Sequence, residues 1–173
     1  MEFLIEEVIE LMYNVFVDVE TTSFHKSVRR PWEIAVIADH VSYKKVIKDV
    51  DLTGADPKSL EVSGFYKRYD QENAISELEA AKFIHSITKG KTLVGTATWF
   101  DSAVLEEMLR RHGHLPEWEG IICIQQLTSD KLGRRIQGLK NCAVALGLDY
   151  EEEGFHEAMY DAVVAKRIYE TIK

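Results

Sequence analysis

Residues 15–26 read VFVDVETTSFHK, and this stretch begins as a buried β-strand before acidic residues interrupt it. Side chains on a strand alternate between its two faces, so the three valines share one face. Phe16, Asp18 and Glu20 share the other, with the two acids ~6.5 Å apart at ~3.3 Å per residue. Such a pair is either a strand end that turns toward solvent or part of a functional site.

The chain has 173 residues, which fits a single domain over residues 1–173 with a core of its own. No run of about 18 apolar residues occurs, so no membrane span is expected. The acidic start lacks the basic residues of a secretory signal. Cys123 and Cys142 form no C-x-x-C pair and are expected to be buried thiols in a reducing compartment. We therefore expect a cytoplasmic location.

The net charge of −8 bears on possible partners. It argues against a protein that coats nucleic acid through a broad basic surface. It is compatible with a nucleic-acid enzyme whose acidic residues are concentrated in one site.

Hydrophobic periodicity predicts an α/β fold built on a central mixed sheet. Strands are expected at residues 15–20, 32–38, 41–50, 92–98 and 121–125. Helices are expected at residues 1–13, 74–88, 102–112, 136–146 and 157–172. Residues 51–73 form a long connection that is typical of a functional loop and has room for a short helix. The N-terminal helical extension, residues 1–13, could be a dimer contact or could cap its own domain.

Two further acids and a histidine stand at informative places. Asp101 follows LVGTATWF, where a strand should end and a helix begin, and a helix N-cap is its simpler interpretation. Asp161 falls on the inward stripe of the last predicted helix, flanked by alanines, although it could also lie at the edge of that stripe. A buried acid without a partner is costly. His156 stands five residues before Asp161.

Four carboxylates within about 5 Å of one another would repel by ~3 kcal/mol per pair at an effective dielectric constant of 20. A fold tolerates this only with bound cations or retained protons. Oxygen ligands select hard ions such as Mg²⁺ or Mn²⁺. Two such ions roughly 4 Å apart form a known clamp for in-line attack at phosphorus. A nearby histidine could deprotonate the attacking water.

These residues resemble the motifs of the DEDD 3′–5′ exonucleases, which share the ribonuclease H-like fold. VFVDVETT resembles the first motif, D-x-E-T, and LVGTATWFDSAVLEEML resembles the second, an F-D followed by an apolar helix. HEAMYDA resembles the third motif of the histidine (DEDDh) subgroup, H-x-A-x-x-D-A. The motifs occur in the family's order between Val15 and Ile172, and the size is similar to that of small stand-alone members, including phage-encoded ones.

The resemblance implies that Asp18, Glu20, Asp101 and Asp161 bind two Mg²⁺ ions, for which Mn²⁺ could substitute, and that His156 is the general base. It also implies a five-stranded sheet with a central first strand and an antiparallel second strand. The expected substrate is the 3′ end of single-stranded nucleic acid, with DNA favoured over RNA, and the expected products are nucleoside 5′-monophosphates. The alternatives are an exoribonuclease that trims RNA ends and a catalytically silent binding subunit, although such a subunit gains nothing from clustered acids.

One departure from the family concerns the terminal nucleotide. Thr96-Ala97 stands where the family usually has His-Asn before Phe100-Asp101, which puts in question how that nucleotide is held. The backbones of Thr21 and Thr22 could reach it, and Phe24 is either a wedge for the last base or a core aromatic. Basic clusters that either contact nucleic acid or form solvated faces are Lys26-Arg29-Arg30, Arg110-Arg111, Lys131-Arg134-Arg135 and the FYKRY stretch, residues 65–69.

Overall fold

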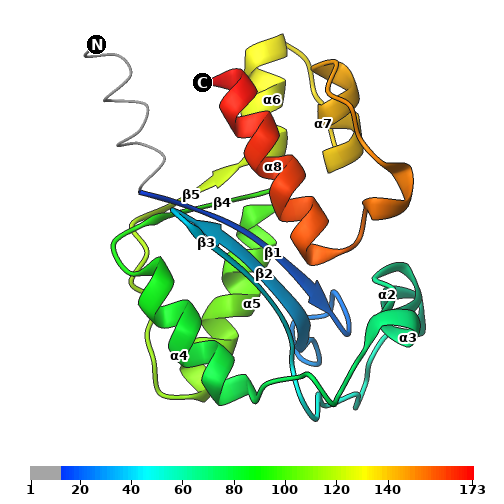
Figure 1. Cartoon of the computed structure of the whole chain (residues 1–173), viewed down its shortest axis with the longest axis vertical. Coiled ribbons are helices and arrows are strands. Elements are labelled where there is room, and N and C mark those ends of the chain that lie inside the picture. Colours follow the sequence, from blue (N-terminus) through cyan, green and yellow to red (C-terminus); the bar gives the residue numbers. More distant parts are fainter. Residues whose placement is uncertain (1–12) are drawn as a thin grey trace.

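Five strands form one mixed sheet in the computed structural model, which describes residues 13–173 (Figure 1). The strands are β1 (Asn14–Thr21), β2 (Pro31–Ala38), β3 (Val41–Val46), β4 (Thr92–Gly95) and β5 (Gly120–Cys123). Their order in the sheet is β3-β2-β1-β4-β5. β2 is antiparallel to β1 and β3, whereas β4 runs parallel to both β1 and β5. The predicted mixed sheet, with its central first strand and antiparallel second strand, is confirmed.

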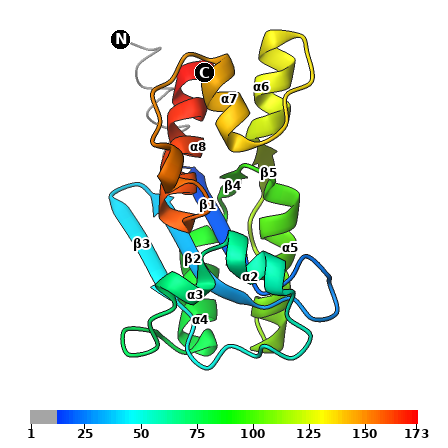
Figure 2. The same ribbon diagram turned by 90° about the vertical axis from the view of Figure 1, so that its right-hand side faces the viewer.

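Helices cover both faces of this sheet (Figure 1). One face carries α6 (Ile124–Leu132), α7 (Leu139–Ala145) and α8 (Ala158–Ile172), and the other carries α4 (Glu77–Thr88) and α5 (Thr98–Arg111). The short helices α2 (Pro57–Val62) and α3 (Phe65–Arg68) lie near the C-terminal end of β1 (Figure 2). A 3₁₀ turn, η1 (Glu152–Gly154), precedes α8.

The alternation along β1 determines which face each side chain joins. Its three valines are buried in the core that α4 and α5 form with the sheet. Phe16 packs against Tyr169 of α8, with ring centroids 5.6 Å apart. Because strand side chains alternate, Asp18 and Glu20 also point toward the α8 side.

α8 lies close to the sheet because its inward side chains are small. Ala158, Ala162 and Ala165 are at most 1% exposed, and they share this face with Asp161, which is 9% exposed. The helix therefore brings a carboxylate down to the sheet at the end of β1 that carries Asp18 and Glu20. This close packing of α8 positions the site described below.

Several predicted boundaries are wrong around Asp101. β4 ends at Gly95 instead of residue 98, and α5 begins at Thr98, four residues before the predicted start. Thr98 Oγ1 donates to the carbonyl oxygens of Gly95 and Ile122, at 2.8 and 2.6 Å, which turns the chain sharply out of the sheet. Asp101 consequently lies inside the first turn of α5 and is not its N-cap, which is Ala97.

Other differences follow from local backbone chemistry. β3 stops at Val46, and the helix predicted over residues 74–88 begins at Glu77, behind a capping box between Ser76 and Glu79. α7 begins at residue 139 because Gly138 adopts a φ of 86°. α6 is an unpredicted helix, because it starts at Ile124, directly after β5, in a stretch whose first two residues were assigned to the strand. The expected short helix in the long connection is present as α2 and α3.

The predicted helix and dimer contact over residues 1–13 fall almost wholly outside the described residues. None of the helices within residues 13–173 is long and apolar enough to cross a membrane.

The junction between β4 and α5 generates a stability prediction. A Cβ atom on Gly95 would lie 2.7 Å from the carbonyl oxygen of Val17 and 3.3 Å from Asp101 Oδ2. We expect Gly95→Ala to lower the free energy of unfolding by ~1–3 kcal/mol, as overpacking does. Gly120→Ala is the matched strand control, because its Cβ would meet Thr92 Oγ1 only at 3.9 Å. Urea unfolding of both variants tests this, and equal losses of stability would contradict it.

Candidate active site

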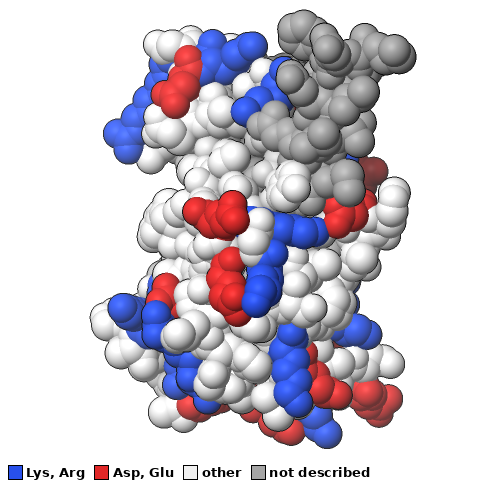
Figure 3. Space-filling model, turned by 90° about the vertical axis from the view of Figure 1, so that its left-hand side faces the viewer, with Lys and Arg blue, Asp and Glu red and all other residues white. Residues whose placement is uncertain are grey.

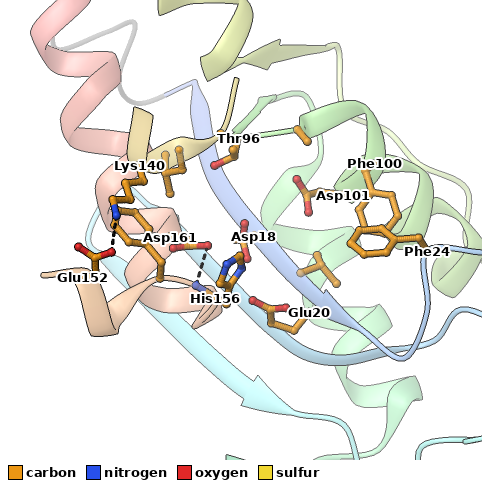
Figure 4. A pocket seen from close by; sticks show the side chains of 15 residues that line it. Asp18, Glu20, Phe24, Thr96, Phe100, Asp101, Lys140, Glu152, His156 and Asp161 are labelled. Atoms are coloured by element: carbon orange, nitrogen blue, oxygen red, sulfur yellow. Dashed lines mark hydrogen bonds and ion pairs between the residues drawn. The ribbon is translucent and has the colours of Figure 1, made fainter. Parts of the chain in front are cut away.

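A pocket of about 560 Å³ opens at the C-terminal end of β1 (Figure 4). Asp18 and Glu20 reach it from β1, Asp101 from α5 and Asp161 from α8, and His156 lines it from the loop before α8. The structure thus brings together all five residues that the motifs singled out. In proteins with an open α/β sheet, ligands commonly bind just beyond the carboxyl ends of the strands, and this pocket lies at such an end.

Three of these residues can reach one common point. Glu20, His156 and Asp161 each offer a ligand atom, and these atoms lie within 4.8 Å of one another. Asp161 Oδ2 accepts the backbone N–H of His156 at 3.3 Å. Asp161 Oδ1 is buried without a hydrogen-bond partner among the described residues. An orphaned carboxylate oxygen beside other acids fits a divalent cation, because a cation supplies the partner that the protein does not.

The electrostatics of the pocket also fit a cation site. Burial, followed by the charges of Asp101, Asp161 and Glu20, raises the pKa of Asp18 well above its usual value. Burial and the nearby Asp161 raise the pKa of Glu20 to about 9. Burial raises the pKa of Asp101 to about 8, although a hydrogen bond from the Val19 backbone N–H acts in the opposite direction. Burial also raises the pKa of Asp161 to about 7. Without cations, the cluster therefore retains protons near neutral pH.

His156 is the exposed member of the cluster, and its backbone is unusual. It has a φ of 66°, a conformation that non-glycine residues rarely adopt. Its N–H is bonded to Asp161, and its carbonyl oxygen accepts Arg68 Nη1 at 3.0 Å. Figure 4 shows the imidazole ring facing the acidic residues. The backbone is held on both sides while the ring faces the pocket.

Aromatic rings form one wall of the pocket. Phe24 is 73% exposed, and its ring centroid lies 5.4 Å from that of Phe100. Phe24 is therefore not a core aromatic, and its role as a wedge stays a prediction. Trp99, which sequence reasoning missed, is 64% exposed and packs edge-on against Phe100 at 6.0 Å. Its position directly before the F-D motif was the feature of the sequence that could have indicated an aromatic residue near the site.

Thr96 and Ala97, which replace the family's His-Asn, both line the pocket. Thr96 Oγ1 is buried and has no hydrogen-bond partner among residues 13–173. Figure 4 shows Thr96 on the opposite side of the pocket from Glu20. This hydroxyl is therefore a buried polar group that the described residues leave without a partner beside the pocket.

The two threonines after Glu20 differ in position. Thr21 lines an adjoining hollow of about 340 Å³, which shares Glu20, Phe24 and His156 with the main pocket. Thr22 is fully buried, its N–H donates to the carbonyl of Arg30, and its own carbonyl accepts the N–H of Asp56. The predicted reach of the Thr22 backbone to a nucleotide is therefore wrong, because the fold uses both groups.

Sequence reasoning also missed a fifth acid on the same face. Glu33 of β2 lies directly opposite Glu20 in the β1–β2 pairing and is 2% exposed. Its Oε2 accepts Arg68 Nη2 at 2.9 Å and the backbone N–H of Ala158 at 3.1 Å. A single acid in the apolar stretch PWEIAVIA was the available signal. Within residues 13–173, Glu33 forms an ion pair and the other four acids form none.

Basic residues from two distant segments share one groove. His25, Lys26 and Arg30 meet Arg110 and Arg111 of α5 across a hollow of about 780 Å³. Glu107 also lines this groove, and His25 directly follows Phe24 of the pocket in the chain. On the face seen in Figure 3, by contrast, basic and acidic side chains lie side by side in small groups.

The remaining basic residues and the FYKRY stretch differ in their surroundings. Arg29 is buried and makes a two-pronged ion pair with Glu107, at 3.0 and 2.7 Å. In FYKRY, Phe65 and Tyr69 pack on Trp32. The interpretation of this stretch as a platform for nucleic acid is therefore wrong for these aromatic rings. Arg134 and Arg135 are exposed in the loop between α6 and α7.

Comparisons with known proteins agree with this geometry. The sequence profile of the RNase_T exonuclease family matches residues 15–169. A structure of exonuclease I has a TM-score of 0.76 at 19% identity, over 92% of this chain and 40% of that chain. For E. coli exonuclease I in complex with a dA16 oligonucleotide the TM-score is 0.77 at 17% identity, with 92% and 40% covered. The zinc-bound complex of E. coli exonuclease I with single-stranded DNA gives 0.74 at 18% identity, with the same coverage. No curated protein sequence matches the chain.

These solved structures establish the fold, and this chain spans about 40% of their length. The family profile, in contrast, extends over most of the chain, from residue 15 to residue 169. The chain therefore belongs to the RNase_T exonuclease family of the DEDD superfamily and has the ribonuclease H-like fold.

Proposed function

We propose that this protein is a divalent-metal-dependent 3′–5′ exonuclease that removes nucleotides from single-stranded nucleic acid, with DNA favoured over RNA. The observation that carries the proposal is the convergence of Asp18, Glu20, Asp101 and Asp161 in one pocket beside His156. The solved exonuclease I complexes contain single-stranded DNA oligonucleotides, which supports DNA as the substrate. A cytoplasmic location, predicted from the free thiols of Cys123 and Cys142, also belongs to the proposal.

The four carboxylates would hold two divalent ions, with Mg²⁺ as the expected metal. Bound there, such ions supply Lewis-acid chemistry that stabilises charge on the transferred phosphoryl group. In the proposal, an imidazole nitrogen of His156 accepts a proton from the attacking water. Phe24, Phe100 and Trp99 offer faces on which bases of any sequence can stack. Hydrolysis of the last phosphodiester releases a nucleoside 5′-monophosphate.

The direct test compares the ends and the type of the nucleic acid. With Mg²⁺ or Mn²⁺, we expect 5′-labelled single-stranded DNA to shorten progressively, and EDTA to stop the reaction. A 3′-phosphate should block degradation because the pocket must receive the terminal nucleotide, whereas a 5′-phosphate should have no effect. Rapid cleavage of circular single strands, or activity that resists EDTA, would refute the proposal. An RNA oligonucleotide of the same sequence decides between the two substrates.

The pKa shifts generate a second prediction, on stability. The folded-state pKa values, about 7 for Asp161 and about 9 for Glu20, lie above the unfolded values of 3.8 and 4.5. The folded state therefore holds protons that the unfolded chain releases. In EDTA, stability should be highest below the unfolded pKa values, should fall as pH rises from about pH 4, and should level off above the folded values, near pH 9. Mg²⁺ should flatten this fall.

Asp161→Asn tests the same cluster because it removes one charge and keeps an oxygen that can accept the His156 N–H. We expect a rate loss of ~10²–10³-fold or more, together with a higher melting temperature in EDTA at pH 8. Asp130→Asn, on the exposed face of α6, is the surface control and should change neither quantity. A lower melting temperature for Asp161→Asn in EDTA would contradict the charge-repulsion account.

The basic groove generates a further prediction on binding. If it follows the strand upstream of the terminal nucleotide, Lys26→Ala and Arg30→Ala should raise KM for an oligonucleotide of about 12 residues and leave kcat unchanged. Each change should reduce the salt dependence of binding by ~0.7 per lost phosphate contact. A dinucleotide substrate should show no effect, because it does not reach the groove. Arg134→Ala and Arg135→Ala are the controls, and equal effects from these would show that only overall charge matters.

A further inference from the structure

Arg68 connects three separate parts of the molecule. It is the last residue of α3, in the long connection after β3. Its Nη2 donates to Glu33 Oε2 at 2.9 Å and to the Ser63 carbonyl at 2.8 Å, and its Nη1 donates to the His156 carbonyl at 3.0 Å. The guanidinium also lies 5.4 Å from the ring centroid of Trp32, on which it is stacked. A planar fork with several donors suits such a junction, whereas an ammonium group does not.

Glu33 extends this junction to the start of α8. Its Oε2 accepts both Arg68 and the backbone N–H of Ala158. The pair therefore holds the chain on both sides of Glu157, at the carbonyl of residue 156 and at the N–H of residue 158. Glu33 is 2% exposed, so its charge requires the compensation that Arg68 supplies.

His156 would not keep this conformation without support. Its φ of 66° is costly for a residue with a Cβ, and such strain persists only where surrounding contacts impose it. Asp161 holds the N–H of the residue and Arg68 holds its carbonyl. The second contact comes from a connection that contributes no acid to the pocket.

We propose that Arg68 and Glu33 are positioning residues that fix His156 relative to Glu20 and Asp161. This inference rests on the proposed function, in which His156 is the general base. Arg68 acts through His156, by geometry, and does not contact the reacting atoms. Its positive charge is also close enough to lower the pKa values of Glu20 and Asp161, so the test must separate geometry from charge.

A double-mutant cycle makes this separation. Single-turnover rates on a 5′-labelled oligonucleotide at saturating Mg²⁺ are compared for wild type, Arg68→Lys, His156→Ala and the double variant. Loss of a general base typically costs ~10²–10⁴-fold, and we expect His156→Ala in that range. Arg68→Lys keeps the charge and loses the fork, and we expect a rate loss of ~10-fold or more with KM unchanged. The double variant should be no slower than His156→Ala, because a base that is absent cannot be misplaced.

The outcomes are distinct. The inference would be overturned if the rate loss of the double variant equalled the product of the two single losses, or if Arg68→Lys had a normal rate. Either result would leave the role of His156 intact. A normal rate for His156→Ala would overturn both the inference and the proposed base. Arg167→Lys is the matched control, since Arg167 Nη1 bonds the Asp149 carbonyl at the other end of the same loop, at 2.9 Å. It should leave the rate unchanged.

A second variant protects the test against misfolding. Removing the Arg68 guanidinium alone would leave the Glu33 carboxylate buried without its cation. Arg68→Leu is therefore combined with Glu33→Gln, which removes that charge. The amide oxygen of the glutamine can still accept the Ala158 N–H. Melting temperature and far-ultraviolet circular dichroism establish that this variant is folded. A folded Arg68→Leu/Glu33→Gln protein should lose rate as Arg68→Lys does, and a wild-type rate would overturn the inference.

Discussion

Mutual repulsion among four carboxylates gathered in one pocket is the constraint on which the rest of the structure depends. At an effective dielectric constant of 20, two charges about 5 Å apart repel by ~3 kcal/mol, a sizeable fraction of the ~5–15 kcal/mol that stabilises a typical domain. Burial first, and this repulsion second, raise the pKa values of Asp18, Glu20, Asp101 and Asp161. The surrounding apolar core must therefore supply the stability that the pocket removes.

The scaffold meets this constraint by placing the acids on regular elements that are packed on their other sides. The valines of β1 are buried against α4 and α5, while alanines let α8 approach the sheet. Glu33 shows how the same face treats an acid that is not part of the pocket, because Arg68 pairs with it. Among Asp18, Glu20, Glu33, Asp101 and Asp161, Glu33 alone has an ion-pair partner among the described residues, which distinguishes it from the four proposed metal ligands.

The sequence predicted the parts of the site that local pattern encodes. Alternation in VFVDVETT placed Asp18 and Glu20 on one face, and the alanine stripe placed Asp161 inward. It could not predict the Glu33–Arg68 pair, because that contact depends on the β1–β2 register and on the path of a long connection. The predictions for Thr22 and for FYKRY were wrong for the same reason. The hydrogen-bond partners of Thr22 and the packing partner of Phe65 lie on other segments of the chain, which local sequence patterns do not reveal. α6 was missed because it is only 9 residues long and follows β5 directly, without a turn between them.

The division between rigid acids and a loop-borne histidine has a physical reason. Acids that repel one another would separate if they stood on loops, so they need helices and strands, whose backbones are held by many hydrogen bonds. The histidine, as the proposed general base, does not need that rigidity, but its ring does need a defined direction. In this structure, one bond from Asp161 and one from Arg68 give that direction to a residue that is otherwise exposed. Asp161 uses Oδ2 to accept the His156 N–H, while its Oδ1 has no partner among the described residues. A ligand bound to Oδ1 would therefore also affect the position of His156. In the proposed mechanism, metal binding and positioning of the base are therefore coupled through the side chain of Asp161, and the contact from Arg68 gives the loop a second support.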